Sequence, residues 1–444
     1  MKGLSTFRRG FVSTLSFDIV SRGMSAVVLV LLLRSLDVED FAFIVLLLNV
    51  GQFLGSAATG GIRMRYSRIE AERFSRRQEE PSAFNAALLS GSGLIVLAAV
   101  LGLLGATTLG LGDDAVQRLA FVGLGTGYTL AHATVELAVY HHQAQLAFFR
   151  AGVIRMVRSG VLLGISLAAT LGLLDSGFSV GLAFAIGVGA VAVAFATPLS
   201  ISTRGATLAR EGRFGFGRET ATLTFYSITT AGWRNLSLFL VAALLNDAAV
   251  AAYGAALRYV LIVFGPVPSI ISVLRVRTAQ QDMIDSDEAQ VDMLKRWARQ
   301  AGLPTLGLLA TVGVIAIWGI PLLDGGRYPD SVPIFQVLLV GAFAQFVTLP
   351  SPNLLVAQKR YTTLAWVNAG GVAFNAALAV VAAELFGVVG IAAAASLMAI
   401  VQAGAATYLA VNPPPGAKSA IAEGTDAEPA LGGPGGSPSK PPGL

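Results

Sequence analysis

The chain has 444 residues, of which 54% are hydrophobic and only 13% are charged, and its mean hydropathy is +0.69. Soluble globular chains are about 25% charged, and a folded surface needs more polar cover than this sequence supplies. The composition therefore excludes a soluble enzyme and predicts an all-α polytopic membrane protein. Because the chain has no cysteine and only three histidines, we expect neither a bound metal nor a cofactor.

A membrane helix needs about 20 mainly apolar residues, and twelve segments meet this requirement. They lie near 11–33, 41–62, 83–111, 119–140, 151–173, 178–201, 222–245, 248–274, 301–323, 331–357, 361–382 and 387–411. The first holds Asp18 and Arg22 within its apolar run, so we interpret it as a retained span and not as a cleaved signal peptide.

The basic residues predict the orientation of these spans. With the N-terminus placed in the cytoplasm, 25 of the 31 lysines and arginines are counted with inner segments, among them Arg150, Arg155 and Arg158 at the inner end of the fifth span. The short outer loops hold three, Arg34, Arg118 and Arg327. This asymmetry follows the positive-inside rule and predicts a multi-pass protein of the cell membrane with both termini cytoplasmic. It also explains the net charge of +5 without a nucleic-acid partner.

The spans divide into two sets of six. The stretch from Leu32 to Phe43 and the stretch from Ala242 to Tyr253 share a pattern in which an aliphatic run breaks at an acidic turn and an aromatic residue starts the next span. We predict an N-terminal lobe over 1–210 and a C-terminal lobe over 211–411. Residues 412–444 are rich in Pro, Gly, Ser and Ala, which predicts a disordered cytoplasmic tail.

Two pairs of ionisable residues fall inside the spans at helical spacing. Asp18 and Arg22 are four residues apart, and so are His132 and Glu136, so each pair shares one helix face. Charges within a membrane cost at least about 2.5–3.5 kcal/mol each on insertion scales. These pairs are either neutralised structural pairs or ion-coupling groups, and the sequence leaves both interpretations open.

Two further arginines, Arg234 and Arg258, fall inside spans without an acidic residue one turn away. An arginine in this position needs water, a distant carboxylate or an anionic ligand. With Arg22, they make the interior of the bundle mildly cationic, which favours an anionic substrate such as a phosphate or pyrophosphate. A cation exporter would instead need a surplus of buried carboxylates.

Three segments carry a resemblance to a known family. They are Leu36-Asp-Val-Glu-Asp-Phe-Ala42 after the first span, Gly60-Gly-Ile-Arg-Met-Arg-Tyr-Ser-Arg68 at the end of the second, and Leu385-Phe-Gly-Val-Val-Gly-Ile-Ala-Ala-Ala-Ala-Ser396 at the start of the last. In order and spacing they resemble motifs of the polysaccharide and oligosaccharide flippases of the multidrug/oligosaccharidyl-lipid/polysaccharide exporter superfamily. Asp37 and Ala42 stand where that family usually has glycine.

The resemblance implies a non-enzymatic alternating-access carrier with two six-helix lobes around a central cationic cavity. The implied cargo is a polyprenyl-pyrophosphate-linked glycan, moved from the inner to the outer leaflet among membrane lipids, with glycan-assembly proteins as possible partners. Arg22, Arg234 and Arg258 are then the expected substrate-binding residues, and Asp18, His132 and Glu136 the candidate ion-coupling residues.

Other functions compete with this one. A cation-coupled multidrug exporter would share the architecture, whereas the peptidoglycan-precursor flippases of the superfamily usually have fourteen spans. A membrane glycan polymerase or ligase would need a sizeable outer loop with polar catalytic residues, and every predicted outer loop is short. A non-transporting scaffold of a polysaccharide machine is a further alternative.

Overall fold

The computed structural model describes residues 2–75, 84–108, 115–202, 218–265, 287–358 and 360–412, together with 267, 270 and 271. Its long elements are helices. They are α1 (Lys2–Ser35), α2 (Val38–Ser75), α3 (Phe84–Thr108), α4 (Ala115–Ala144), α5 (Phe148–Thr170), α6 (Gly177–Ser202), α7 (Arg218–Leu244), α8 (Asp247–Val263), α11 (Asp287–Trp297), the π-helix η3 (Ala298–Gly302), α12 (Leu303–Asp324), α13 (Ser331–Val347), α14 (Pro350–Ala357) and α15 (Tyr361–Val411).

Each of the twelve predicted spans coincides with helix. The first eight match α1 to α8, the ninth matches α12, the tenth matches α13 with α14, and the last two lie within α15. Within the predicted eighth span, 248–274, α8 ends at Val263 with Phe264 as its C-cap, and the described residues 267, 270 and 271 beyond it are again helical. Pro266 and Pro268, between these parts, lie outside the described residues.

Glycine and proline explain two breaks in the C-terminal half. Within α15, Gly387 has φ of +59°, a conformation that costs glycine little, and the chain reverses there. The two halves then run antiparallel, since Arg360 Nη1 donates to Leu409 O at 2.7 Å. The tenth span bends by 50° between α13 and α14, where Pro350 lacks the N–H that a continuous helix requires.

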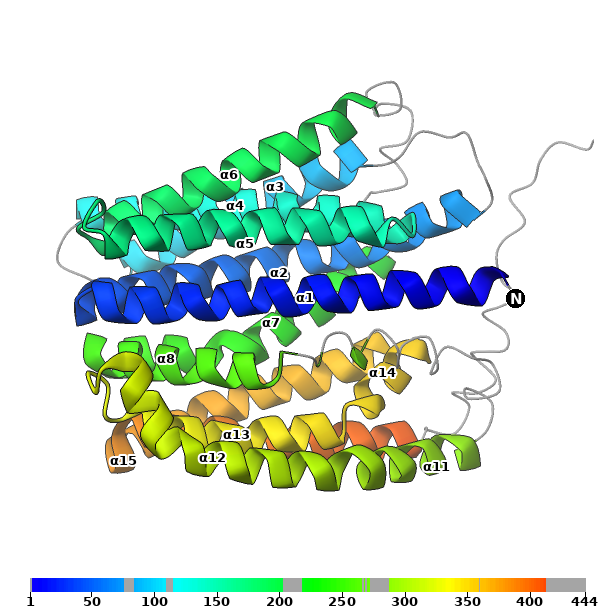
Figure 1. Ribbon diagram of the computed structural model, residues 1–444. Helices are drawn as coiled ribbons and strands as arrows, with labels where there is room; N and C mark the ends of the chain where they lie inside the picture. The colour runs from blue at the N-terminus through cyan, green and yellow to red at the C-terminus, as the bar shows by residue number, and fades with distance from the viewer. Residues whose placement is uncertain are drawn as a thin grey trace, which may run out of the picture.

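The helices form two lobes that lie one above the other in Figure 1. Helices α1–α6 make the upper lobe, and α7, α8 and α11–α15 make the lower one. The largest apolar core continues across both lobes and includes fully buried Leu33, Leu47, Val241, Ala255 and Ile391. The predicted arrangement of two six-helix lobes is therefore confirmed.

The structure does not describe the residues on which the predicted domain limits depend. The boundary between 210 and 211 falls in the segment 203–217, which lies outside the described residues. The predicted tail lies outside them as well, apart from Asn412. Both limits stay predictions.

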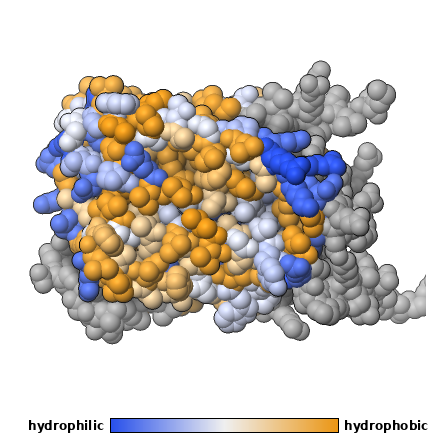
Figure 2. Space-filling model, turned by 90° about the horizontal axis from the view of Figure 1, so that it is seen from below, coloured by the Kyte–Doolittle hydropathy of each residue, from blue (hydrophilic) through white to orange (hydrophobic). Residues whose placement is uncertain are grey.

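The surface of the bundle has an apolar middle and polar ends. Figure 2 shows hydrophobic residues across the centre of one face and hydrophilic residues toward its two ends. Among the described residues, five helices are long and apolar enough to cross a membrane, or six if α13 with α14 counts as one bent span. One of the five is α15, which reverses at Gly387 and so holds two of the predicted spans.

The lobes touch toward both ends of the bundle. Near the end that holds the N-terminus, α2 and α7 approach closely, because a Cβ on Gly61 would lie 2.6 Å from the backbone nitrogen of Thr224. Beside this contact, Ser227 Oγ donates to Ser56 O at 2.6 Å.

At the opposite end, two arginines join α1 to α12. Arg34 donates to Leu323 O at 3.0 Å and to Leu322 O at 2.6 Å. Arg327 donates in return to the α1 end, at 3.3 Å to the carbonyls of Leu33 and Arg34 and at 3.0 Å to that of Leu36. We call Arg34 and Arg327 the arginine latch.

Candidate functional site

A first cavity of about 550 Å³ lies between the lobes, with walls from α1, α2, α7, α8, α13 and α15. This volume is within the range of about 300–1,000 Å³ that is typical of ligand pockets. Arg22, Arg234 and Arg258 all line it. The structure therefore brings together the three arginines that the sequence singled out, from three different helices.

The three guanidinium groups are held differently. A Cβ on Gly265 would lie 3.2 Å from Arg22 Cδ, so the glycine leaves room for the stem of Arg22 beside the end of α8. Arg22 and Arg258 are partly buried and Arg234 is exposed. Neither Arg234 nor Arg258 makes a hydrogen bond or ion pair with any described residue. Their donors are available to water or to a ligand.

Neutral amides supply much of the remaining polar lining of the first cavity. Asn235 Nδ2 donates to Ala231 O at 2.8 Å, and Asn49 Nδ2 reaches Asn235 O at 3.4 Å. Asn375, only 1% exposed, donates to Ser237 Oγ at 3.2 Å. Its Oδ1 is buried and has no hydrogen-bond partner among the described residues.

Two more amides of this lining, Gln52 and Gln345, have no side-chain hydrogen bond within the described part of the chain. An amide both donates and accepts, so these side chains suit a ligand that carries hydroxyl groups.

A second cavity of about 420 Å³ adjoins the first, and Arg22, Gln52 and Arg258 line both. The second cavity lies mainly within the N-terminal lobe, where α4 and α5 add four basic or acidic residues. They are His132, Glu136, Arg155 and Arg158. The candidate ion-coupling residues and the candidate substrate-binding residues thus line adjoining spaces.

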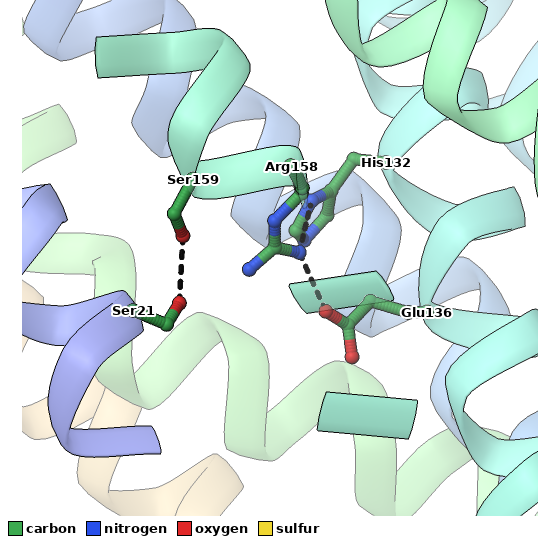
Figure 3. Close-up of polar contacts among 5 residues, drawn as sticks. All are labelled: Ser21, His132, Glu136, Arg158 and Ser159. Atoms are coloured by element: carbon green, nitrogen blue, oxygen red, sulfur yellow. Dashed lines mark hydrogen bonds and ion pairs between the residues drawn. The ribbon is translucent and has the colours of Figure 1, made fainter. Parts of the chain in front are cut away.

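Glu136 pairs with an arginine of the next helix and not with His132, as its spacing had suggested. Arg158 Nη1 donates to Glu136 Oε1 at 2.6 Å and lies 3.3 Å from His132 Nδ1 (Figure 3). The ring of Tyr128 stacks on that of His132, with centroids 6.0 Å apart. His132 and Glu136 do share a helix face, and that face turns toward Arg158.

Beside this group, Ser21 Oγ on α1 and Ser159 Oγ on α5 lie 2.6 Å apart (Figure 3). Asp18 is on the same helix as Ser21, one turn earlier, but its side chain lies outside the part of the structure that is described. Its predicted pairing with Arg22, and its role in ion coupling, therefore stay predictions.

Sequence reasoning missed Arg155 and Arg158. Both were counted with the inner segments, yet both lie inside α5, which runs from Phe148 to Thr170. Their three-residue spacing places them on one helix face. That spacing inside an apolar segment could have identified them as residues of the cavity. They were instead attributed to the positive-inside rule, because arginine at the inner end of a span can serve either membrane orientation or ligand binding.

Within the described residues, no three His, Asp or Glu side chains come close enough to hold a metal ion. The arginines and amides of the lining offer ionic and hydrogen-bonding contacts to a ligand.

No family model matches the chain, and no curated protein matches it. Solved structures do match. The lipid II flippase MurJ in an inward closed conformation gives a TM-score of 0.66 at 14% identity, over 93% of this chain and 89% of that one. An inward-facing multidrug resistance MATE family transporter of the MOP superfamily gives 0.64 at 13% identity, over 94% and 99%. A mutant of the Vibrio cholerae MATE transporter VcmN gives 0.56 at 16% identity, over 94% and 97%.

At these identities the matches establish the fold. The chain has the helical two-lobe fold that MATE transporters and MurJ share, so the predicted fold class and the predicted resemblance to this superfamily are confirmed at that level. These solved structures are of transporters and of a flippase.

Proposed function

We propose that the chain is a flippase that moves an anionic polyprenyl-pyrophosphate-linked glycan across the cytoplasmic membrane by alternating access, with both termini in the cytoplasm. The observation that carries this proposal is the charge of the two cavities. Five arginines line them, Arg22, Arg155, Arg158, Arg234 and Arg258, against one described carboxylate, Glu136.

Such a surplus of positive charge between membrane helices favours an anionic ligand. Guanidinium groups bind phosphate through paired N–H donors, and a site shielded from water strengthens each contact. Arg234 and Arg258, which have no ion-pair partner among the described residues, come from different helices, α7 and α8. A pyrophosphate bound between them would compensate charges that are otherwise costly to keep there.

The amides support a glycan on the same lipid. Gln52, Gln345 and Asn375 line the first cavity, and amides both donate to and accept from hydroxyl groups. Trp233 adds an aromatic surface to this lining. We expect membrane lipids around the carrier and glycan-assembly proteins as its partners.

A cation-coupled multidrug exporter is the second candidate. The matches to multidrug resistance MATE transporters favour it, and Glu136 supplies a carboxylate in the N-terminal lobe. A cationic drug, however, would meet four more arginines than carboxylates among the described lining residues.

Reconstituted protein separates the two candidates. Proteoliposomes would receive a short-chain polyprenyl pyrophosphate that carries a fluorescent disaccharide, and quenching from outside would report its transfer between leaflets. We expect transfer by the wild type and its loss in Arg258→Ala at normal protein abundance. Export of ethidium at wild-type rates by Arg258→Ala, together with no transfer of the lipid by either protein, would establish the drug exporter instead.

A further inference from the structure

The pair between Arg158 and Glu136 is open to the second cavity. Arg158 is 18% exposed and Glu136 17% exposed, and both line this cavity. Only Nη1 of Arg158 contacts the carboxylate. Figure 3 shows the other terminal nitrogen pointing away from Glu136 and His132.

This single contact leaves most of the guanidinium available. Nε and Nη2 of Arg158 make no hydrogen bond with any described residue. Arginine that serves only to fix two helices commonly holds a carboxylate with two parallel N–H donors. Arg158 instead keeps two donors for a further acceptor, on the cavity side of the pair.

We propose that Arg158, together with Arg155 and Arg258 around the second cavity, is a phosphate-binding site, and that the carboxylate of Glu136 lowers its affinity so that cargo can leave. The inference rests on the proposed function, because it takes the anionic head group as the cargo. It adds Arg155 and Arg158 to the three arginines expected from the sequence, and it gives Glu136 a role in release.

A carrier must bind its cargo and also let it go. Five arginines around one pyrophosphate would hold it strongly in a site of low dielectric constant. Glu136 offsets one of these charges at a distance of 2.6 Å. His132 on α4, Arg63 on α2 and Arg155 on α5 act on the same carboxylate, so Glu136 is the one acid among several described basic groups.

Binding of inorganic pyrophosphate to the purified full-length protein in nanodiscs tests this inference by calorimetry. Loss of one nearby negative charge strengthens the field on the anion, so we expect Glu136→Gln to bind about tenfold more tightly than the wild type. Arg158→Gln should bind about tenfold more weakly. Glu136→Asp keeps the charge on a shorter side chain, so its affinity should lie between those of the wild type and Glu136→Gln.

Glu384→Gln is the matched control, since Glu384 is exposed on α15 and lines neither cavity. It removes the same charge and should leave binding unchanged. Farnesyl pyrophosphate is the second probe, because it separates a lipid head group from free pyrophosphate. Tighter binding of both probes to Glu136→Gln supports the inference, whereas tighter binding of the inorganic ion alone would overturn the assignment to the cargo.

A purely structural pair gives a different pattern. Both single variants would then lower the unfolding temperature and leave the dissociation constants at the wild-type value, which would overturn the inference. If Glu136→Gln does not fold, Arg158→Gln decides, and unchanged binding by it overturns the inference as well.

Failure of the proposed function is distinguishable from failure of this inference. If the wild type and Arg258→Gln both fail to bind either probe, the proposed function fails. If the wild type binds, Arg258→Gln weakens binding and Glu136→Gln does not tighten it, only the role of Glu136 fails.

Discussion

The contacts of the arginine latch predict which end of the bundle must open during transport. Arg327 supplies a positive charge to the carbonyl end of α1, and Arg34 does the same for α12. Because α1 belongs to one lobe and α12 to the other, the end with the latch cannot open while both arginines keep these contacts. We expect Arg327→Gln to favour the state that is open at this end.

The size of the effect follows from the contacts. A cation at a helix C-terminus contributes about 0.3–1 kcal/mol, and a hydrogen bond contributes about 0.5–1.5 kcal/mol net. Arg327 donates three such bonds, but two are long at 3.3 Å and its side chain is 38% exposed, so solvent screens it. The ion pair with Asp37, which is 90% exposed, adds little. We therefore expect about 1–2 kcal/mol, or about 5- to 30-fold in the population of the open state.

Thiol labelling at one introduced cysteine measures this population, because the chain has no other cysteine to react. Ser25 lines the second cavity and is exposed to it, so Ser25→Cys is a single reporter for a membrane-impermeant maleimide added outside intact cells. Labelling should accelerate about 5- to 30-fold in Arg327→Gln. Arg296→Gln is the control, since Arg296 is on α11 and, among the described residues, pairs only with Asp292 of its own helix. An unchanged labelling rate in Arg327→Gln would refute the role of the latch.

Three further predictions concern Arg258, the contact between α2 and α7, and the orientation of the chain in the membrane. Arg258→Lys should retain part of the lipid transfer that Arg258→Ala loses, because lysine keeps the charge but not the paired donors; equal loss in both would indicate that shape, not charge, matters there. Gly61→Ala should lower the unfolding temperature, because its Cβ would meet Thr224 backbone 2.6 Å away, whereas Gly123→Ala on α4, with open space around it, should not; equal temperatures would contradict the close contact of α2 and α7. Reporter fusions at Arg213 and Gly325 should report cytoplasm and exterior respectively, and the reverse result would overturn the predicted orientation.

The fold could be predicted because membrane helices leave a strong pattern in sequence. Apolar runs placed the twelve spans on helices, and the structure places the turn between the last two at Gly387. Helix ends were less predictable. The helix α1 begins at Lys2 and α2 continues to Ser75, because a polar extension beyond the apolar run still forms helix at no membrane cost.

The candidate site was predictable in part. Arg22, Arg234 and Arg258 stood out because each lies deep in an apolar run, and the structure places all three around one cavity. Their binding role stays a prediction. The partner of Glu136 was not predictable, because it depends on how α5 packs against α4, and helix spacing reports only neighbours on one helix. Helix spacing suggested His132, four residues earlier on α4, as the partner of Glu136, whereas the structure pairs Glu136 with Arg158 of α5.

Arginines that depart from the positive-inside pattern are the informative ones in this chain. Among the three expected in outer loops, Arg34 and Arg327 occupy the carbonyl ends of helices from opposite lobes, so a structural contact explains why positive charge is kept there. The arginines inside spans line the cavities, and Arg155 and Arg158 join them once α5 is seen to contain both. Topology alone demands charge at the cytoplasmic ends of helices, and it has no use for arginine at either of these other places. An arginine that orientation does not require therefore indicates another role. In this bundle, those at the outer helix ends join the two lobes, and those within the spans line the cavities where a ligand would bind.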